Sequence, residues 1–364
     1  MGIYQHVLRP LAFRSDAEAM HDRAVRMGSR VGACPWLTRW LSRRYTVDDP
    51  RLRCTVAGLD VPNPIGLAAG YDKSGYSVAT LAALGFGSIE VGSVSADPSD
   101  GNPRPRLWRS PEDEAIIVNY GLPNEGAEAV AQRLSKVRLP MPLGINVVKT
   151  NRLQTEPDEA VFADYEAGVR GVKDVCDYLM INLSCPNTES GRDFFGEPGQ
   201  VAEVLRRLDA LELTIPVFFK ISPMGGDEAL DRVLEEADPF PWVSGFMLNL
   251  PPGKPVALSL PPERLEAMPG AVAGKPIQGI IDERTAALYR RMDKDRYRLI
   301  AAGGVFNAED AYRKIRLGAS LVQLLTGLVY EGPGAVRRIN QGLLAIIERD
   351  GLGHIHDALG ADAV

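Results

Sequence analysis

Short apolar runs alternate with amphipathic stretches along the chain from about residue 64. The stretches between the runs repeat apolar positions with helical spacing, for example over residues 200–213, 227–237, 308–317 and 334–349. Runs that are apolar on both faces are typical of parallel strands buried on both sides. Eight such strand–helix units predict a closed (β/α)8 barrel, the TIM barrel, rather than an open doubly wound sheet. The predicted strands are 64–69, 88–95, 143–148, 178–185, 216–222, 245–250, 298–304 and 321–327.

The first 50 residues follow a different pattern. Two amphipathic helices are predicted at 16–30 and 35–44, with Met20, Trp36 and Trp40 among arginines. Such helices are typical of segments that lie in a membrane interface, although a helical pair packed on the barrel has the same pattern. A strand-like stretch at 51–61 predicts a hairpin at the bottom of the barrel. We therefore divide the chain into a helical segment, 1–50, and a barrel, 51–364.

Charge and cysteine content narrow the partners and the compartment. The net charge of −6 gives no overall attraction to nucleic acid, but ten arginines lie within the first 53 residues. This segment suits an acidic phospholipid surface, or equally a solvated helical face. The four cysteines are scattered and form no CxxC pair, which favours reduced thiols over a metal site. We expect a cytoplasmic protein that is peripheral on the inner face of the cell membrane.

Polar residues occur where the predicted strands end. In a (β/α)8 barrel these ends form the active-site rim. Packing does not require polar groups there, so their convergence predicts a binding pocket. The residues concerned are Lys73, Asn146, Asn182, Ser184, Cys185, Asn187, Lys220 and Asn249.

Glycine turns follow the last two predicted strands. Gly303-Gly304 ends one and Thr326-Gly327 ends the other. Glycines at these two places let backbone N–H groups approach a phosphate. The chain has no GxGxxG motif of the dinucleotide type, so flavin mononucleotide (FMN) fits this rim better than a dinucleotide does.

The positions of the four histidines exclude a histidine as the general base in the barrel. His6, His21, His354 and His356 all lie outside the predicted barrel. The remaining candidates are Lys73, Lys220, the rim carboxylates and Cys185. A free thiol titrates near pH 8.5 and can accept a proton near neutral pH when its surroundings shift it modestly. We favour Cys185 because it stands at a strand end beside two asparagines.

Several segments resemble the dihydroorotate dehydrogenase family. They are residues 63–73 (NPIGLAAGYDK), 85–92 (GFGSIEVG), 102–109 (NPRPRLWR), 182–188 (NLSCPNT) and 318–323 (GASLVQ), together with 348–351 and 357–361. The opening segment, with Tyr4, Arg9, Phe13, Asp16 and His21, is similar to the membrane-associated, quinone-using class. The resemblance extends over nearly the whole chain.

The resemblance implies a role for each matching residue. Cys185 would remove the C5 proton of dihydroorotate, while hydride passes from C6 to the N5 atom of FMN. Quinone would then reoxidise the flavin in a tunnel beside His21 and Arg109. The implied substrate-binding residues are Lys73, Asn119, Asn182, Asn187 and Asn249. The implied cofactor-binding residues are Ala69, Gly70, Lys73, Ser93, Asn146, Asn182, Lys220, Gly274, Gly303, Gly304, Thr326 and Gly327.

Four positions depart from the family pattern. Cys185 replaces the serine of the membrane-associated class, and Val118 stands where the family has a substrate-binding Asn, with Asn119 next to it. Leu250 replaces a Thr, and Leu325 replaces a tunnel Tyr. These changes leave a second hypothesis open, an FMN-dependent oxidoreductase for a less polar cyclic or enoyl substrate. A third hypothesis is a catalytically silent flavin-binding or membrane-scaffolding barrel. Such a barrel needs neither Lys73 nor Cys185, so the presence of both residues argues against it.

Overall fold

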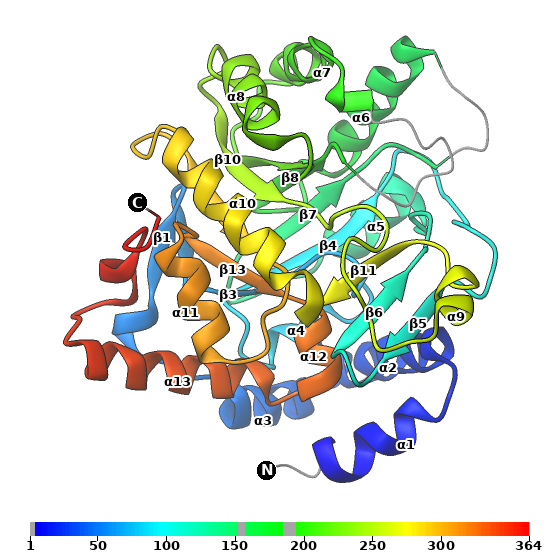
Figure 1. The fold of residues 1–364 in the computed structure, drawn as a ribbon, viewed down its shortest axis with the longest axis vertical. Coiled ribbons are helices and arrows are strands. Elements are labelled where there is room, and N and C mark those ends of the chain that lie inside the picture. Colours follow the sequence, from blue (N-terminus) through cyan, green and yellow to red (C-terminus); the bar gives the residue numbers. More distant parts are fainter. Residues whose placement is uncertain (1–3, 152–156, 185–193, 364) are drawn as a thin grey trace.

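A closed barrel of parallel strands forms the centre of the molecule (Figure 1). The structure, a computed structural model, describes residues 4–151, 157–184 and 194–363. Around the barrel the strand order is β10-β12-β13-β3-β4-β7-β8-β9. All eight predicted strands are therefore confirmed. Their bounds are β3 Ile65–Leu67, β4 Ser88–Val94, β7 Leu143–Val147, β8 Tyr178–Asn182, β9 Val217–Ile221, β10 Val243–Leu248, β12 Arg298–Ala301 and β13 Leu321–Leu324.

Amphipathic helices surround the barrel and bury their apolar stripes against it (Figure 1). In α7, for example, the buried residues Val201, Val204, Leu205 and Leu208 recur at helical spacing. The four helices expected from the sequence are all present. The helices after the strands are α4 Val78–Ala82, α5 Gly126–Leu134, α6 Asp158–Val172, α7 Gln200–Asp209, α8 Gly226–Ala237, α9 Pro262–Glu266, α10 Gln278–Arg291, α11 Ala308–Arg316, α12 Thr326–Glu331 and α13 Ala335–Asp350.

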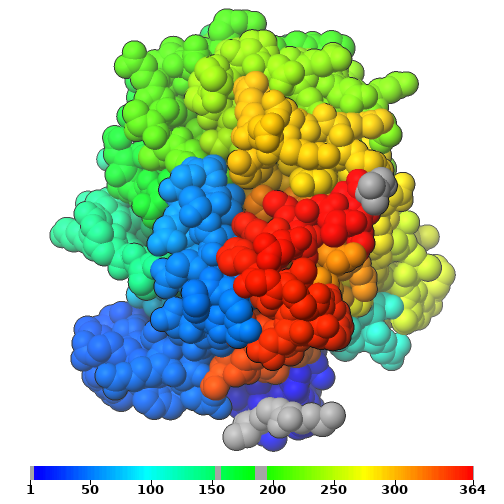
Figure 2. All heavy atoms as spheres, turned by 90° about the vertical axis from the view of Figure 1, so that its left-hand side faces the viewer, coloured from blue at the N-terminus to red at the C-terminus, as the bar shows by residue number. Residues whose placement is uncertain are grey.

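The predicted hairpin before the barrel is present as β1 Cys54–Val56 and β2 Leu59–Val61, which pair antiparallel. Its inward residues are buried in the main core. Figure 2 shows the hairpin beside the C-terminal segment. There His354 Nε2 lies 2.8 Å from the carbonyl oxygen of Arg53, and Arg51 forms an ion pair with Glu348. The end of the chain thus holds the hairpin in place.

A second sheet, which the sequence analysis did not anticipate, lies beside the barrel. It consists of β5 Leu107–Ser110, β6 Ala115–Val118 and β11 Ala271–Gly274, in the order β11-β6-β5. All its pairings are antiparallel, with β6 in the middle. The sheet joins two segments that are far apart in the sequence and places them next to the rim of the barrel (Figure 1).

The N-terminal helices pack against one edge of the barrel (Figure 1). They are α1 Arg9–Phe13, α2 Ala17–Gly32 and α3 Pro35–Tyr45, so both predicted helices are confirmed. Helix α2 approaches α4 closely at Gly28, where a Cβ atom would lie 2.8 Å from Ser77 Cβ. The Thr80 hydroxyl also donates to the Gly28 carbonyl at 2.6 Å. These contacts tie the N-terminal helices firmly to the barrel and do not separate the two parts of the chain. The division into a helical segment, 1–50, and a barrel, 51–364, therefore stays a prediction.

Candidate active site

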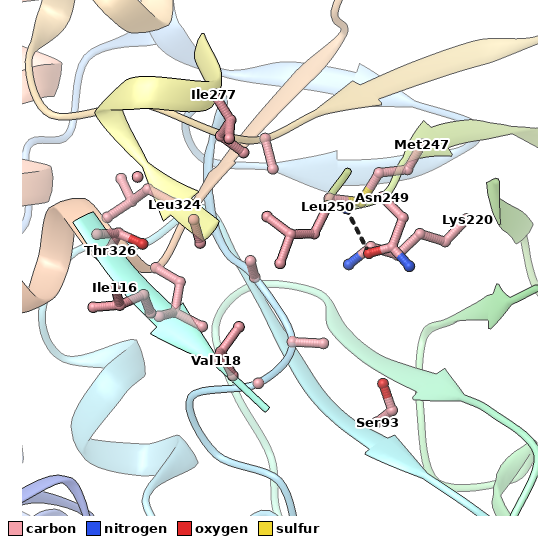
Figure 3. Close-up of a pocket in the computed structure, with 18 of the residues that line it drawn as sticks. Ser93, Ile116, Val118, Lys220, Met247, Asn249, Leu250, Ile277, Leu324 and Thr326 are labelled. Carbon is pink, nitrogen blue, oxygen red and sulfur yellow. Dashed lines mark hydrogen bonds between the residues drawn. The ribbon is translucent and has the colours of Figure 1, made fainter. Parts of the chain in front are cut away.

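A cavity of about 220 Å³ opens at the carboxyl ends of the barrel strands (Figure 3). This is where the sequence placed the binding pocket. Most of the predicted site residues line it together, although they come from seven strands of the barrel, the loops after them, and β11. The predicted residues that line the cavity are Ala69, Gly70, Lys73, Ser93, Asn182, Lys220, Asn249, Gly274, Gly303, Gly304, Thr326 and Gly327.

Polar side chains gather on one side of this cavity. In Figure 3 Lys220, Asn249 and Ser93 lie on the same side. Asn249 donates from Nδ2 to Asn182 Oδ1 at 3.1 Å and to the Ser184 carbonyl at 2.6 Å. Asn182 donates in turn to Ser93 Oγ at 3.4 Å. These amides and lysines can recognise a planar ligand with carbonyl, amide and carboxylate groups.

Glycine-rich backbone forms another part of the wall. Gly274, Gly303, Gly304 and Gly327 line the cavity, and the first three have positive φ angles of 111°, 87° and 73°. At Gly304 an added Cβ would lie 2.5 Å from Gln278 Cβ, so a larger residue does not fit there. Backbone that is free of side chains leaves room for phosphate oxygens to reach N–H groups. This wall and the polar side of the cavity together fit FMN.

The remaining wall is apolar. Ile116 and Val118 point into the cavity from β6, and Leu250 and Leu325 face it from loops. Tyr120 continues the alternation, so 116, 118 and 120 share one face of the chain. Asn119 is not among the lining residues: its Oδ1 accepts a hydrogen bond from Asn102 Nδ2 at 3.1 Å. Ile116 and Tyr120 are not predicted as lining residues, because residues 115–118 are apolar at every position and show no alternation that would mark a cavity-facing side.

Among the other predicted residues, Asn146 does not line the cavity. Asn146 is fully buried behind Ser93, whose hydroxyl donates to Asn146 Oδ1 at 2.6 Å. It therefore reaches the cavity through Ser93 rather than by lining it. Cys185 and Asn187 lie outside the described residues, and their assigned roles stay predictions.

A second cavity of about 430 Å³ lies between the N-terminal helices and the barrel. Its lining is mostly apolar and includes Phe13 and Met20 from the N-terminal segment and Leu328 from α12. His21 and Arg109, the predicted tunnel residues, both line it. The Arg109 guanidinium donates to the carbonyl oxygens of Ala12 and Asp16, each at 3.2 Å, and so connects α1 and α2 to the sheet.

The two cavities share a wall made by Gly70, Ile116, Tyr120 and Leu325. At this wall Lys73 Nζ lies 3.3 Å from His21 Nε2 and 3.9 Å from the centre of the Tyr120 ring. Burial lowers the pKa of Lys73 to about 8. Burial, with the nearby Lys73 charge, also holds the pKa of His21 well below its usual value. A cation and a neutral imidazole therefore meet between the polar and the apolar cavity.

Comparison with known proteins agrees with this arrangement. The profile of the family described as Dihydroorotate dehydrogenase matches residues 51–347. The chain is 38% identical over 362 residues to the dihydroorotate dehydrogenase (quinone) of Natronomonas pharaonis, covering all of both chains. It is 37% identical to that of Thermobifida fusca, covering 99% of this chain and 97% of the relative.

Solved structures give the same result. The structure superposes on the dihydroorotate dehydrogenase of Eimeria tenella in complex with ferulenol with a TM-score of 0.80. The identity is 28%, and the match covers 95% of this chain and 96% of the other. The fold and the family expected from the sequence are thus confirmed, and FMN is the cofactor that goes with them. The chain belongs to the dihydroorotate dehydrogenase family.

Proposed function

We propose that the protein oxidises dihydroorotate to orotate with FMN and passes the electrons to a quinone. The observation that carries this proposal is the pair of cavities with a common wall. One lies at the strand ends and has lysine and amide side chains on one side, and the other lies under the N-terminal helices and is mostly apolar. Such a pair suits a charged substrate and a hydrophobic electron acceptor that use the same flavin at separate sites. The relatives in Natronomonas pharaonis and Thermobifida fusca are named for this quinone-dependent activity.

The proposed reaction gives roles to several residues that line the first cavity and to Cys185. Gly303, Gly304 and Gly327 would hold the phosphate of FMN, which supplies a two-electron acceptor when bound. Lys73 and Lys220 provide positive charge for the flavin and for the substrate carboxylate. Asn182 and Asn249 would orient the amide edges of the substrate, and Cys185 would take the C5 proton. The quinone would take its electrons from the flavin, so the quinone needs no contact with the substrate.

The second cavity would hold the quinone ring. Its apolar lining favours a hydrophobic molecule over water. His21, held at the wall by Lys73, and Arg109, held by two carbonyl oxygens, are the polar groups we assign to the quinone oxygens. Because Gly70 and Leu325 line both cavities, the acceptor and the flavin would be separated by little more than one layer of side chains.

The N-terminal helices also provide the surface we assign to membrane docking. Val7, Leu8, Leu11, Met27, Trp36 and Trp40 are exposed, with Met27 and Trp36 each 63% accessible. These six residues are all in the first 40, where arginines are frequent. Exposed aromatic and aliphatic groups beside arginines favour the boundary of an anionic bilayer. Among the described helices none combines the length and apolarity needed to traverse a membrane. We therefore propose peripheral association with the inner face of the cell membrane.

An anaerobic titration tests the proposed reaction. Dihydroorotate should bleach the flavin absorbance of the purified protein, and a short-chain quinone should restore it. If dihydroorotate leaves the flavin oxidised while orotate fails to perturb its spectrum, the proposed substrate is wrong. If bleaching occurs but quinone does not restore the colour, the acceptor is wrong.

A sedimentation experiment tests docking. The protein should pellet with vesicles of mixed neutral and anionic lipid, and less with neutral vesicles. The double variant Trp36→Ser and Trp40→Ser should remain in the supernatant while its flavin is still reduced by dihydroorotate. Equal pelleting of the variant and the parent protein would contradict membrane association through these helices.

A further inference from the structure

The turn after β12, residues 303–306, lies in a part of the first cavity that offers a ligand little charge. We call it the glycine turn. Among the described residues that line this cavity, the cationic ones are Lys73 and Lys220. Figure 3 shows Lys220 across the cavity from Thr326, the first residue of α12. The proposed function places the phosphate of FMN at these turns, so main-chain N–H groups must provide most of its contacts.

Three N–H groups of the glycine turn are available for such contacts. Those of Gly303, Gly304 and Val305 form no hydrogen bond with any part of the chain that the structure describes. All three residues line the first cavity. Glycine lets a peptide group rotate at little cost, so the turn by itself does not fix where these groups point. Contacts from outside the turn must hold them.

Two side chains from neighbouring helices hold the peptide groups of the glycine turn. Gln278, the first residue of α10, donates from Nε2 to the Gly304 carbonyl at 3.0 Å. Asp310 on α11 accepts from the Phe306 N–H at 3.0 Å. Within the described residues no other hydrogen bond reaches either of these backbone groups. The C=O and N–H of a trans peptide point in opposite directions, so the Gln278 bond turns the Val305 N–H away from Gln278.

Asp310 also determines how Gln278 is turned. Asp310 is only 2% exposed, and its Oδ1 accepts from Gln278 Nε2 at 2.8 Å and from Lys275 Nζ at 2.7 Å. Burial alone would raise the pKa of Asp310, but hydrogen bonds from Lys275 and Gln278 outweigh it and lower the pKa. The carboxyl is therefore ionised at neutral pH. An ionised carboxyl only accepts, so it keeps the amide nitrogen of Gln278 on the side of the Gly304 carbonyl.

We infer that Asp310 is a positioning residue for the phosphate of the cofactor. It holds the Phe306 N–H directly and the Gly304 carbonyl through Gln278, and so keeps the N–H groups of the glycine turn available to phosphate oxygens. This inference rests on the proposed function, which assigns the phosphate of FMN to this turn. A carboxylate near a phosphate repels it, so removing the charge would by itself strengthen FMN binding. Loss of the positioning has the opposite effect and weakens binding.

Riboflavin, which is FMN without its phosphate, separates the glycine turn from the rest of the site. The FMN-loaded full-length protein is diluted, and the fluorescence of released flavin gives the dissociation constant for FMN. Displacement of FMN by added riboflavin gives the dissociation constant for riboflavin. Both constants are compared between the wild type and Asp310→Asn.

An amide at position 310 cannot keep all the contacts of the carboxyl. It places a donor either against the Phe306 N–H or against Gln278 and Lys275, so one end of the glycine turn is released. The affinity for FMN should fall at least about tenfold, while that for riboflavin should stay within about twofold of the wild type. An unchanged affinity for FMN, or an equal loss for both flavins, would overturn the inference.

Asn307→Ala is the matched control, because it weakens the same helix without removing a bond to the glycine turn. Asn307 is exposed, and as the N-cap of α11 its Oδ1 accepts from the Asp310 N–H at 2.8 Å. The substitution should lower the unfolding temperature and leave the ratio of the FMN and riboflavin affinities unchanged. A change in this ratio as large as that in Asp310→Asn would assign the effect to helix stability and overturn the inference.

Thermal unfolding of each variant shows whether the protein still folds. If Asp310→Asn does not fold, Gln278→Leu carries the test, because leucine is of similar size and cannot donate to the Gly304 carbonyl. It should lower the ratio of FMN to riboflavin affinity about fivefold or more, and an unchanged ratio would overturn the inference. A wild type that binds FMN no more tightly than riboflavin would overturn it together with the phosphate assignment. The proposed oxidation of dihydroorotate would still stand, since the anaerobic titration tests it separately.

Discussion

The two cavities share a wall but use their polar residues differently. In the first cavity, amide and lysine side chains from several strands face the space where a ligand would lie. In the second, the Tyr4 hydroxyl donates to the Val329 carbonyl and Thr80 donates to the Gly28 carbonyl. Arg109 likewise donates to two carbonyl oxygens. Polar groups in the second cavity mainly hold the N-terminal segment on the barrel.

This difference suggests how one flavin can serve two chemically unlike partners. The strand ends, fixed by the barrel, supply the precise polar contacts that proton and hydride transfer require. The added helices supply a mostly apolar space, where a hydrophobic acceptor would be held mainly by buried apolar area, with His21 and Arg109 as its polar contacts. The two half-reactions should therefore respond independently to substitutions in the two regions.

The largest effect should come from Cys185→Ala. Removing the proposed base should slow flavin reduction by dihydroorotate by about 10²–10⁴-fold. Stopped-flow absorbance measures this step, and reoxidation of chemically reduced enzyme by quinone should keep its normal rate. FMN should remain bound. An unchanged rate of reduction would remove Cys185 from the base role.

Lys73 lies at the wall between the cavities, and its charge should be visible in ligand binding. Burial lowers its pKa to about 8, below the 10.5 of an exposed lysine. The ammonium group is therefore lost as pH rises through 8, and affinity for the orotate carboxylate should fall about tenfold between pH 7 and 9. Flavin difference spectra measure this affinity. In Lys73→Met the affinity should be low at both pH values, and a pH dependence that survives the substitution would assign it to another group.

Lys73 also predicts the direction of a stability change. Above pH 8 the folded protein releases this proton while the unfolded chain still holds it. The unfolded state then binds more protons, so stability should rise with pH between about 8 and 10.5 through this group. The difference between wild type and Lys73→Met in urea unfolding isolates this contribution from those of other residues.

Val118→Asn should sharpen the contrast within the first cavity. An added amide on this apolar wall can form one hydrogen bond with a polar substrate. Such a bond is worth about 1 kcal/mol, so KM for dihydroorotate should fall about fivefold. Asn119→Ala is the matched control: Asn119 bonds to Asn102, so its loss should cost stability and leave KM unchanged. A lower affinity in Val118→Asn would show that the native wall is adapted to a less polar ligand edge.

The smallest effect should come from Gly28→Ala. Its methyl group would lie 2.8 Å from Ser77 Cβ, so α2 must move away from α4. We expect a two- to threefold increase in KM for quinone and no change in the rate of flavin reduction. Gly279→Ala, on a helix with open space around the added methyl, should not affect either reaction. Equal effects of the two variants would deny the second cavity a role in quinone use.

Sequence patterns were sufficient to predict the barrel, because its strands are apolar on both faces and follow one another at regular intervals. They failed for β5, β6 and β11, which are only four residues long, and the pairing of β6 with β11 joins segments that are far apart in the sequence. Short antiparallel strands give little periodicity, so the apolar wall with Ile116 and Tyr120 was missed. The strand-end residues Asn182, Lys220 and Asn249 were found because their position follows from the fold alone.

Two other features could not be read from the sequence. The place of Asn146 at a strand end predicts a cofactor contact, but its position behind Ser93 follows from the register of β4 against β7, which shifts between Gly92 and Val94. The contact between Lys73 and His21 joins residues from separate segments, and sequence patterns give no distance between them. Such contacts are consequences of packing between elements rather than of any single element.

The pairing of β6 with β11 has a consequence for how the protein is made. Ala115 pairs with Gly274, so the sheet beside the cavity cannot close until the ribosome has delivered most of the barrel. Tyr4 and Arg9 donate to the carbonyl oxygens of Val329 and Tyr330, so the second cavity joins residues that are 325 and 321 positions apart. Contacts of such long range form late. A nascent chain can therefore capture cofactor only after residue 327 has been made, and truncations that remove this residue should be colourless.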